Sequence, residues 1–173
     1  MTVIGGFHND YLESVILSDS VIEISDEAFS ECTNLVNISL DSNLQIIGNE
    51  SFRNCFSLEK IELPFGLAEI GESAFWASGL KTVTIPGNVE IINNYLFIGC
   101  PSLEEIVLNE GVLDIREEAF AGCESLQKIS IPNTVSSIDA SAFNDVDTVS
   151  IVTTAGSYAE TYANENGIPC EIQ

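Results

Sequence analysis

The 173-residue chain carries 27 acidic and 5 basic side chains, which gives it a net charge of -22. Such a charge argues against nucleic acids and anionic membrane surfaces as partners, because their phosphate groups would be repelled. With 45% hydrophobic residues the chain can bury a core of its own, and no apolar run approaches the roughly 20 residues that span a bilayer.

A phenylalanine recurs along the chain at intervals of 22 or 23 residues and defines a repeat. An isoleucine stands five residues before each of the last six phenylalanines, and the residue just before most of them is small. The repeated phenylalanines are Phe7, Phe29, Phe52, Phe75, Phe97, Phe120 and Phe143. A unit of this length cannot bury its apolar side chains alone, so successive units must stack into one continuous core.

The N-terminal segment, residues 2–7, fits only the tail of a repeat, with Val3 and Ile4 near the position expected for its isoleucine. It is either a weak cap or the continuation of a longer array, and we expect the second. The sequence MTVIGGFHND has none of the basic region, long apolar segment and small-residue cleavage site of an export signal, although a chain trimmed of its signal would look the same.

Each repeat then supplies one strand, because its apolar residues follow the pattern L-x-x-[IV]-x-[LI]. The last two apolar positions alternate with polar ones, which is the period of a half-buried strand of about three to five residues. The six instances are Leu12-Val15-Leu17, Leu35-Ile38-Leu40, Leu58-Ile61-Leu63, Leu80-Val83-Ile85, Leu103-Ile106-Leu108 and Leu126-Ile129-Ile131. Pro64, Pro86 and Pro132 directly follow three of these strands, where a missing N–H group ends pairing. We expect the strands to pair in parallel into a single sheet.

The segment from the isoleucine to the phenylalanine, such as IGESAF at 70–75 or IREEAF at 115–120, suits one turn of 3₁₀- or α-helix on the opposite face. The whole pattern, I-x-x-x-A-F-x-x-C-x-x-L-x-x-I-x-[LI]-P over about residues 2–145, resembles the BspA-like class of leucine-rich repeats. The expected fold class is an α/β repeat: a right-handed leucine-rich-repeat solenoid with one parallel sheet on its concave face and short helical turns on its convex face. The asparagine that follows the strand in more familiar leucine-rich repeats is not repeated here.

After Phe143 the period breaks, and residues 146–173 are expected to form a last strand and a cap, separate from the repeats at residues 1–145. A helix is predicted over residues 158–166: Ser157 and Glu160 have capping-box spacing, and Gly167 followed by Pro169 supplies stop signals. The expected packing face of this helix is Tyr158, Ala159 and Tyr162. In the last strand, Val146, Val149 and Ile151 align with Leu80, Val83 and Ile85.

Four cysteines each fall three residues after a repeat phenylalanine and three before the leucine: Cys32, Cys55, Cys100 and Cys123. None occurs where this linker is one residue shorter, so the cysteine is expected to fill, as a small buried hydrophobe, room that only the longer linker offers. Side chains that point inward in register lie parallel, so neither disulfides nor a tetrahedral zinc site are expected. Cys170, in the cap, is expected to be buried as well.

No catalytic, cofactor or metal site is predicted. The single histidine, His8, lies in a polar turn near a terminus, and the sequence has no glycine-rich phosphate loop, dinucleotide fingerprint or H-E-x-x-H run. Stacking brings Asp26, Glu27, Glu50 and Glu72 onto neighbouring turns, but no column is acidic in every repeat, so a specific calcium site is not expected. A hydrolase acting through carboxylates would need a deep pocket that holds two of them.

Two surfaces are candidates for partner binding. The polar side chains of the strands form a nearly neutral, hydroxyl-rich face to which all three lysines belong. The column after the phenylalanine places Trp76 between Arg53 and Ile98, where a guanidinium stacks well on an indole. The candidate partner-binding residues are Arg53, Phe56, Lys60, Glu62, Phe65, Trp76, Thr82, Thr84, Glu105 and Lys128. Alternatively, the first surface is an ordinary solvated sheet face and the second is partly buried between turns.

The leading interpretation is a non-catalytic module, not an enzyme, that acts as a monomer and binds another protein, such as a host extracellular or matrix protein. Because BspA-like repeats are common in bacterial surface proteins, the resemblance implies a cell-surface or secreted location and a role in adhesion. The competing interpretation is a structural spacer in a longer repeat protein. No cofactor is expected in either case.

Overall fold

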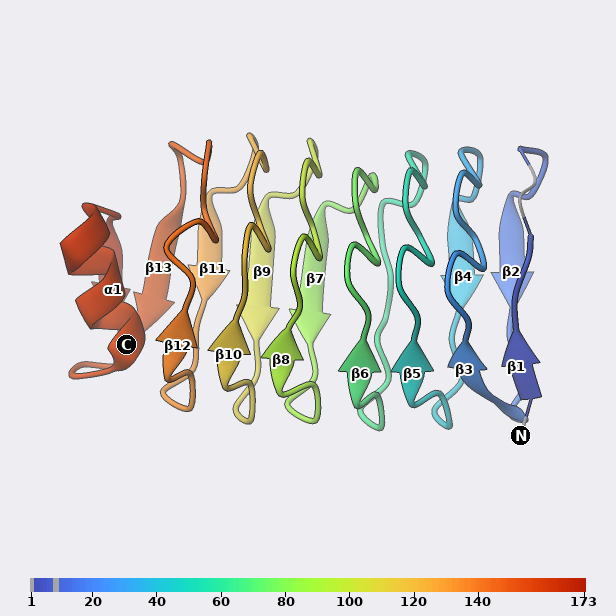
Figure 1. Cartoon of the computed structure of the whole chain (residues 1–173), viewed down its shortest axis with the longest axis horizontal. Helices are drawn as coiled ribbons and strands as arrows, with labels where there is room; N and C mark the ends of the chain where they lie inside the picture. Colours follow the sequence, from blue (N-terminus) through green and yellow to red (C-terminus); the bar gives the residue numbers. More distant parts are fainter. Residues whose placement is uncertain (1, 8–9) are drawn as a thin grey trace.

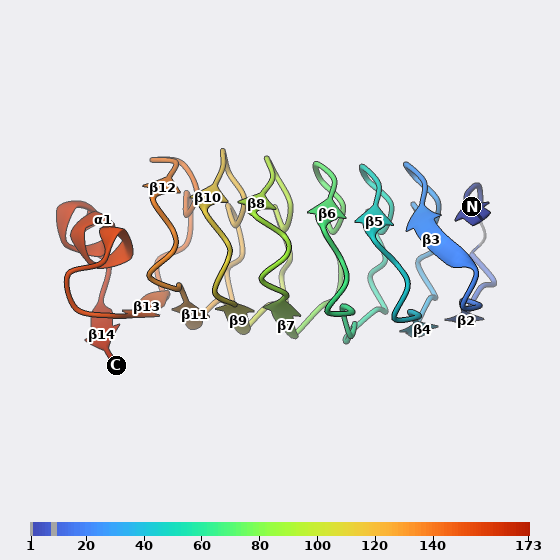
Figure 2. The same ribbon diagram turned by 90° about the horizontal axis from the view of Figure 1, so that it is seen from below.

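The computed structural model describes residues 2–7 and 10–173, with side chains from residue 5 onward in these ranges. The chain winds into a stack of turns, and its two termini lie at opposite ends of the stack (Figure 1). Two rows of short strands run along the stack on either side of the core (Figure 2). Every strand pair is parallel. The architecture is therefore a parallel β-solenoid.

The first row, which we call the long row, contains five of the six strands predicted from the L-x-x-[IV]-x-[LI] pattern, together with two strands near the C-terminus. Its members are β2 (Ser14–Ile16), β4 (Asn37–Ser39), β7 (Thr82–Ile85), β9 (Glu105–Leu108), β11 (Lys128–Ser130), β13 (Ser150–Thr153) and β14 (Cys170–Ile172). The register joins equivalent repeat positions, as in the pairing of Val83 with Ile106 and of Ile106 with Ile129. The predicted parallel pairing of these strands is confirmed.

The second row, which we call the short row, was not predicted. It consists of β1 (Thr2–Ile4), β3 (Val21–Ile24), β5 (Ile46–Ile47), β6 (Glu69–Ile70), β8 (Ile91–Ile92), β10 (Asp114–Ile115) and β12 (Ser137–Ile138). Each of these strands from β3 onward ends at the isoleucine that stands five residues before a phenylalanine. The predicted helical turns are not confirmed among the described residues, since hydrogen-bonded turns follow these strands instead.

The reason for this difference is that successive N–H groups of this segment bond alternately within the turn and to the next turn in the stack, as the Ala28 N–H donates to the Ser25 carbonyl and the Phe29 N–H to the Ser51 carbonyl. The Phe52 N–H donates to the Ala74 carbonyl one repeat later at 2.8 Å, and the Phe97 N–H donates to the Ala119 carbonyl at 2.8 Å. In addition, the residue two positions before the phenylalanine is left-handed in five repeats, for example at Glu50 with φ 52°. A left-handed residue cannot continue a right-handed helix, so the segment forms a turn.

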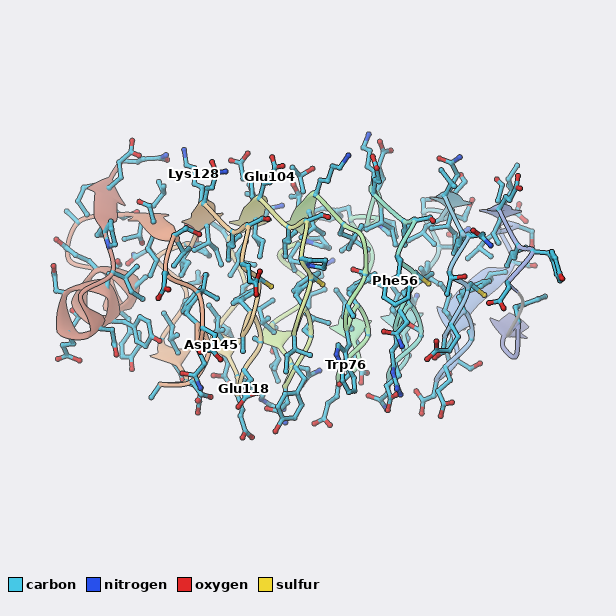
Figure 3. All side chains as sticks on the ribbon, turned by 90° about the horizontal axis from the view of Figure 1, so that it is seen from above. Phe56, Trp76, Glu104, Glu118, Lys128 and Asp145 are labelled. Atoms are coloured by element: carbon cyan, nitrogen blue, oxygen red, sulfur yellow. The ribbon has the colours of Figure 1, made fainter. Side chains whose placement is uncertain are left out.

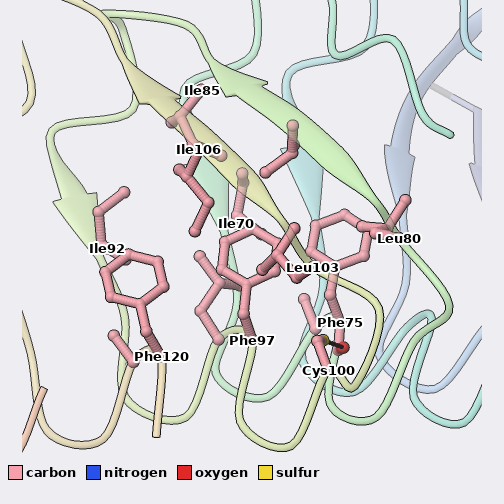
Figure 4. Packing of buried hydrophobic residues seen from close by; sticks show 14 of the residues in the cluster. Ile70, Phe75, Leu80, Ile85, Ile92, Phe97, Cys100, Leu103, Ile106 and Phe120 are labelled. Carbon is pink, nitrogen blue, oxygen red and sulfur yellow. Dashed lines mark hydrogen bonds between the residues drawn. The ribbon is translucent and has the colours of Figure 1, made fainter. Parts of the chain in front are cut away.

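A continuous column of phenylalanine rings runs through the core, and Figure 4 shows its part from Phe75 to Phe120 among buried leucines and isoleucines. From Phe7 to Phe143, successive ring centroids lie 5.3–5.9 Å apart and successive ring planes are inclined by 6–22°. The five middle rings are fully buried. The carbonyl of the residue before each phenylalanine accepts the N–H of the preceding phenylalanine, as Ala74 and Leu96 do, so the backbones of the two turns lie in contact.

The C-terminal end of the ring column is closed by helix α1 (Tyr158–Asn166), whose bounds are those predicted. The Ser157 side chain accepts the Glu160 N–H at 3.1 Å, and Gly167 ends the helix with φ 68°. Tyr162 packs against Phe143 with a centroid separation of 6.1 Å. The predicted packing face needs one correction: Ala159, Tyr162 and Ala163 are buried, whereas Tyr158 is 45% exposed. Among the described residues no helix has the length and hydrophobicity to cross a membrane.

The predicted alignment of the last strand is wrong by two residues. Ile151 pairs with Ile129, the position to which the pattern assigned Val149. The cause is that buried and exposed residues do not alternate along β13. Ile151, Val152 and Thr153 are all buried, because α1 packs against this strand and β14 pairs with it. A strand buried on both faces gives no period-two signal.

The long row is interrupted in its middle, contrary to the prediction of one continuous sheet. The segment Leu58–Leu63 forms no strand, and only an isolated bridge between Lys60 and Thr82 joins it to β7. The row therefore divides into a two-stranded sheet, β2-β4, and a five-stranded sheet, β7-β9-β11-β13-β14. The short row also divides, between β6 and β8. Both interruptions adjoin the linker Phe75–Leu80, which is one residue shorter than its neighbours.

Candidate functional site

The interruption of the long row coincides with two surface grooves, which we together call the seam groove. One half, of about 340 Å³, lies toward β7 and is lined by Lys60, Ile61, Glu62, Leu63, Phe65, Thr82, Val83, Thr84, Pro86 and Asn109. The other half, of about 330 Å³, lies toward β2 and is lined by Ser14, Val15, Ile16, Asn37, Ile38, Ser39, Leu40, Lys60 and Glu62. Lys60 and Glu62 line both halves, so they form the ridge between them.

An exposed ion pair lies on this ridge. The Lys60 ammonium donates to Glu62 Oε1 at 2.7 Å, and the two side chains are 71% and 82% exposed. Hydrogen bonding and charge attraction from Lys60 lower the pKa of Glu62. A second pair lies beside it, in which Lys81 Nζ is 2.7 Å from Glu59 Oε2, but neither of these residues lines the groove. Two of the three lysines on this face are thus locally neutralised.

Apolar side chains flank the ridge on both sides. Ile16 is 83% exposed and Phe65 is 81% exposed. The backbone at Phe65 is held by the next repeat, because Asn88 Nδ2 donates to the Phe65 carbonyl at 2.9 Å. The seam groove therefore presents a charged pair between two exposed apolar groups on a backbone that is tied to its neighbours.

The predicted residues of the sheet face fall in two places. Lys60, Glu62, Thr82 and Thr84 lie in the seam groove. Glu105 and Lys128 lie further along the same row, where they are partners in the β9-β11 register. Figure 3 shows Lys128 and Glu104 projecting on the side of the stack opposite Trp76 and Glu118.

The second predicted surface is separate from the first. The Arg53 guanidinium lies over the Trp76 ring at 4.6 Å from its centroid, as predicted, and its Nη1 also contacts Glu50 Oε2 at 2.7 Å. Trp76 is 39% exposed and Phe56 is 56% exposed. Phe65, which the sequence grouped with these aromatic residues, belongs instead to the seam groove.

The cysteines are packing residues that form a hydrogen-bonded series along the core. Each thiol donates to the carbonyl of the phenylalanine one turn back, as Cys100 does to Phe75 at 3.0 Å and Cys123 to Phe97 at 3.1 Å. Burial raises the pKa of Cys55 to about 12, and the hydrogen bond with Cys100 together with burial raises the pKa of Cys123. None of the five cysteines is in a disulfide, and Cys170 is half-buried where full burial was expected.

One part of the cysteine interpretation is wrong. The shorter linker does offer the same room, because Ser78 stands three residues after Phe75 and is fully buried there. Its N–H donates to the Phe75 carbonyl at 3.0 Å, as the Cys100 N–H donates to the Phe97 carbonyl at 3.1 Å. Ser78 Oγ lies 3.4 Å from Cys100 Sγ. A small side chain therefore fills this position in the shorter linker after Phe75 as well, whereas Asp10, at the equivalent position after Phe7, is exposed.

Groups that could carry chemistry are sparse in the described part of the chain. No cluster of three or more histidine, cysteine, aspartate or glutamate side chains with metal-binding geometry occurs there, and His8 lies outside the described residues. The half of the seam groove toward β7 contains one carboxylate, that of Glu62. Two carboxylates, Glu69 and Glu90, line a depression of about 460 Å³ on the short row together with Arg116.

The sequence did not reveal the seam groove, although two signals were present. Phe65 occupies a position that is polar or glycine in the other repeats, at Asp19, Ser42, Gly87, Glu110 and Asn133. The linker Phe75–Leu80 marks the repeat beside which the rows are interrupted. Neither signal states which strand would leave the sheet, because both lie outside the segment 58–63 that leaves it.

Comparison with solved structures places the fold among bacterial leucine-rich repeat proteins. A leucine-rich repeat protein from Bacteroides ovatus is 26% identical with a TM-score of 0.75, over 85% of this chain and 41% of that chain. A leucine-rich repeat protein of T. pallidum is 24% identical with a TM-score of 0.67, over 92% of this chain and 86% of that chain. A leucine-rich cell surface protein from Faecalibacterium prausnitzii is 21% identical with a TM-score of 0.53, over 88% of this chain and 62% of that chain.

This chain thus spans less than half the length of the B. ovatus protein. No curated protein matches it. Residues 5–112 and 90–164 match the family described as the BspA type leucine-rich repeat region, in 6 copies. The matched residues include all seven stacked phenylalanines and extend into α1. The chain belongs to the BspA-type leucine-rich repeat family.

Proposed function

We propose that this chain is a non-catalytic module that binds another protein through the long-row face, centred on the seam groove. The observation that carries the proposal is the pair of exposed apolar side chains, Ile16 and Phe65, on either side of the Lys60–Glu62 ridge. Exposed aromatic and aliphatic groups on a rigid surface are typical of protein-binding sites. Leucine-rich repeat scaffolds of this type generally act in protein binding, which agrees with this assignment.

The rigidity of the long-row face favours a role in binding another protein. The long-row strands are held through β-ladders and through a core of stacked rings, so little conformational entropy remains to be lost when a partner docks. The depressions on the face are open, and their linings offer few reactive groups. The polar groups there are hydroxyls, amides and single charged side chains. Such a lining suits contact with a protein surface better than the chemistry of a bond-breaking site.

The cellular context follows from the family and is part of the same proposal. BspA-like repeats are common in bacterial surface proteins, so we place the chain on a cell surface or in a secreted protein, as a monomeric adhesion module. The partner class is a host extracellular or matrix protein. The remaining predicted residues on the long row, Glu105 and Lys128, extend the same contact surface, while Arg53, Phe56 and Trp76 form a second one.

A structural spacer is the second candidate function. The observation in its favour is the unbroken ring column, which links all seven turns from Phe7 to Phe143. A spacer needs this stiffness and needs no particular side chain on its faces. Substitution of exposed residues should therefore impair a binding module and leave a spacer unaffected, which distinguishes the two functions.

Site-directed photocrosslinking tests the proposal. A benzophenone amino acid at position 82, in the seam groove, is expected to crosslink an extracellular-matrix protein, and the same group at position 69, on the short row, is not. Phe65→Ser should remove the position 82 crosslink, and Trp76→Ala is the matched control for loss of an exposed aromatic ring outside the groove. Equal crosslinking from positions 82 and 69, or a yield unaffected by Phe65→Ser, would favour the spacer.

A further inference from the structure

The charge distribution limits what can approach the seam groove. The chain has only 5 basic side chains, and four of them already contact a carboxylate within the chain: Arg53–Glu50, Lys60–Glu62, Lys81–Glu59 and Arg116–Asp114. The remaining carboxylates give the surface a large uncompensated negative charge. An acidic partner would be repelled over about 8 Å at physiological ionic strength, whereas a basic one would be attracted.

Glu62 is the carboxylate best placed to bind a cation from a partner. It is the only acidic residue in either half of the groove, and its side chain is 82% exposed. Its present partner, Lys60, comes from the same segment two residues away. An ion pair this exposed contributes little to stability, because water competes for both charges. A lysine or arginine from another protein can therefore take the place of Lys60 at little cost.

The spacing of the groove defines the size of the segment that fits. The phenylalanine rings of successive turns lie 5.3–5.5 Å apart here, so the three intervals from the turn of Ile16 to the turn of Thr84 cover about 16 Å. An extended chain advances about 3.3 Å per residue, which makes this distance about five residues long. Apolar side chains on either side of the basic residue would then lie against Ile16 and Phe65.

We propose that the seam groove binds an extended cationic segment of a partner protein, in which a lysine or arginine displaces Lys60 from Glu62 and flanking apolar side chains pack on Ile16 and Phe65. This inference rests on the proposed function and adds the charge and length of the recognised segment. Lys60 is then an internal competitor: it keeps Glu62 paired when the groove is empty and moves aside when the partner binds.

Immobilised hexapeptides test this inference with the full chain in solution. One array carries Lys or Arg at the two central positions and Leu, Ile, Val or Phe on both sides, and matched arrays carry Glu or Gln at the centre. The basic array should bind most tightly, and binding should weaken as NaCl is raised. Glu62→Gln should lower the affinity for basic peptides about three- to fivefold. Lys60→Gln should raise it by a similar factor, because it frees the Glu62 carboxylate.

Lys81→Gln is the matched control. It removes a lysine from the same face and frees Glu59, which does not line the groove, so the affinity should stay within about twofold of the unmodified chain. Weaker binding by the Lys60→Gln variant overturns the inference, and so does an equal gain from Lys81→Gln, which would indicate a general effect of net charge.

Two further outcomes separate this inference from the proposed function. If Gln or Glu peptides bind as tightly as basic ones and lose affinity on Phe65→Ser, the preference for cations is refuted while protein binding at the groove stands. If no peptide in any array binds, the groove does not recognise linear segments and the inference fails. In that case the crosslink from position 82 still decides whether the long-row face binds a folded partner.

Discussion

The stability of the solenoid should depend on where in the ring column a phenylalanine is lost. Phe97 is fully buried between two rings, with centroids 5.4 Å from Phe75 and 5.9 Å from Phe120. Phe7 is 46% exposed and has a ring neighbour on one side, Phe29 at 5.5 Å. Phe97→Ala and Phe7→Ala remove the same atoms from these two environments, so they form a matched pair.

The expected costs follow from burial and stacking. Replacing a buried phenylalanine by alanine costs about 3–5 kcal/mol, and each lost ring pair adds about 0.5–1.5 kcal/mol. The site cannot collapse easily, because the Phe97 N–H and the Leu96 carbonyl bond to the turns on either side at 2.8 and 3.0 Å. Phe97 loses two ring pairs, so we expect about 4–8 kcal/mol for Phe97→Ala and about 1–2 kcal/mol for Phe7→Ala, whose ring is half exposed.

Urea and thermal unfolding followed by circular dichroism measure both variants. For a chain of this size each kcal/mol lowers the midpoint temperature by about 2–4 °C, so Phe97→Ala should lower it by roughly 10–30 °C. A Phe7→Ala variant destabilised as much as Phe97→Ala would refute the reasoning, because the cost would then not depend on ring burial. A change in the urea m-value would indicate that the repeats unfold separately, as one-dimensional arrays can.

Four other predictions concern backbone strain and the thiols. Ala77 is left-handed with φ 52°, so Ala77→Gly should raise the free energy of unfolding by about 0.5–1 kcal/mol in the same urea assay, and an unchanged or lower value would contradict this. A methyl group at position 87 would overlap the Glu110 carbonyl oxygen, so Gly87→Ala should be destabilising by more than about 1 kcal/mol. The pKa of the Cys55 thiol is raised from 9.0 to about 12 by burial. Maleimide at pH 8 should therefore modify half-buried Cys170 in the native chain and spare Cys55, which mass spectrometry can verify. Because the native thiol stays protonated where the unfolded one ionises, the Cys55 contribution to stability is present below pH 9 and should be lost as the pH rises toward 12.

The sequence predicted features that depend on residue identity at a fixed period. The spacing of Phe29, Phe52 and Phe75 was enough to place the core column, since a ring that recurs in register must stack on its equivalents. Helix α1 was predicted to the residue, because the Ser157 cap and the Gly167 stop act through local geometry alone. These signals are carried by a few neighbouring residues and do not depend on the rest of the fold.

The short row and the seam could not be read in the same way. A strand of two residues such as Ile46–Ile47 is too short to show alternation, and its hydrogen-bond partners are one repeat away in each direction. The helical prediction for the following segment considered bonds within one repeat, whereas every second N–H group there, such as those of Glu27 and Phe29, bonds to the next turn. The seam is an interruption of pairing between turns, which a pattern within one repeat does not encode.

The regularity of a solenoid also bears on where its specificity can reside. Positions that repeat faithfully, such as the phenylalanine column, are buried and unavailable to a partner. The exposed positions repeat poorly: Ile16 is matched by Ser39, Glu62 and Thr84 on the following turns. A partner that distinguishes this chain from another BspA-type array must therefore contact the departures from the repeat. Phe65, Ile16 and the Lys60–Glu62 pair are such departures, and the interruption of the long row brings them together around one groove.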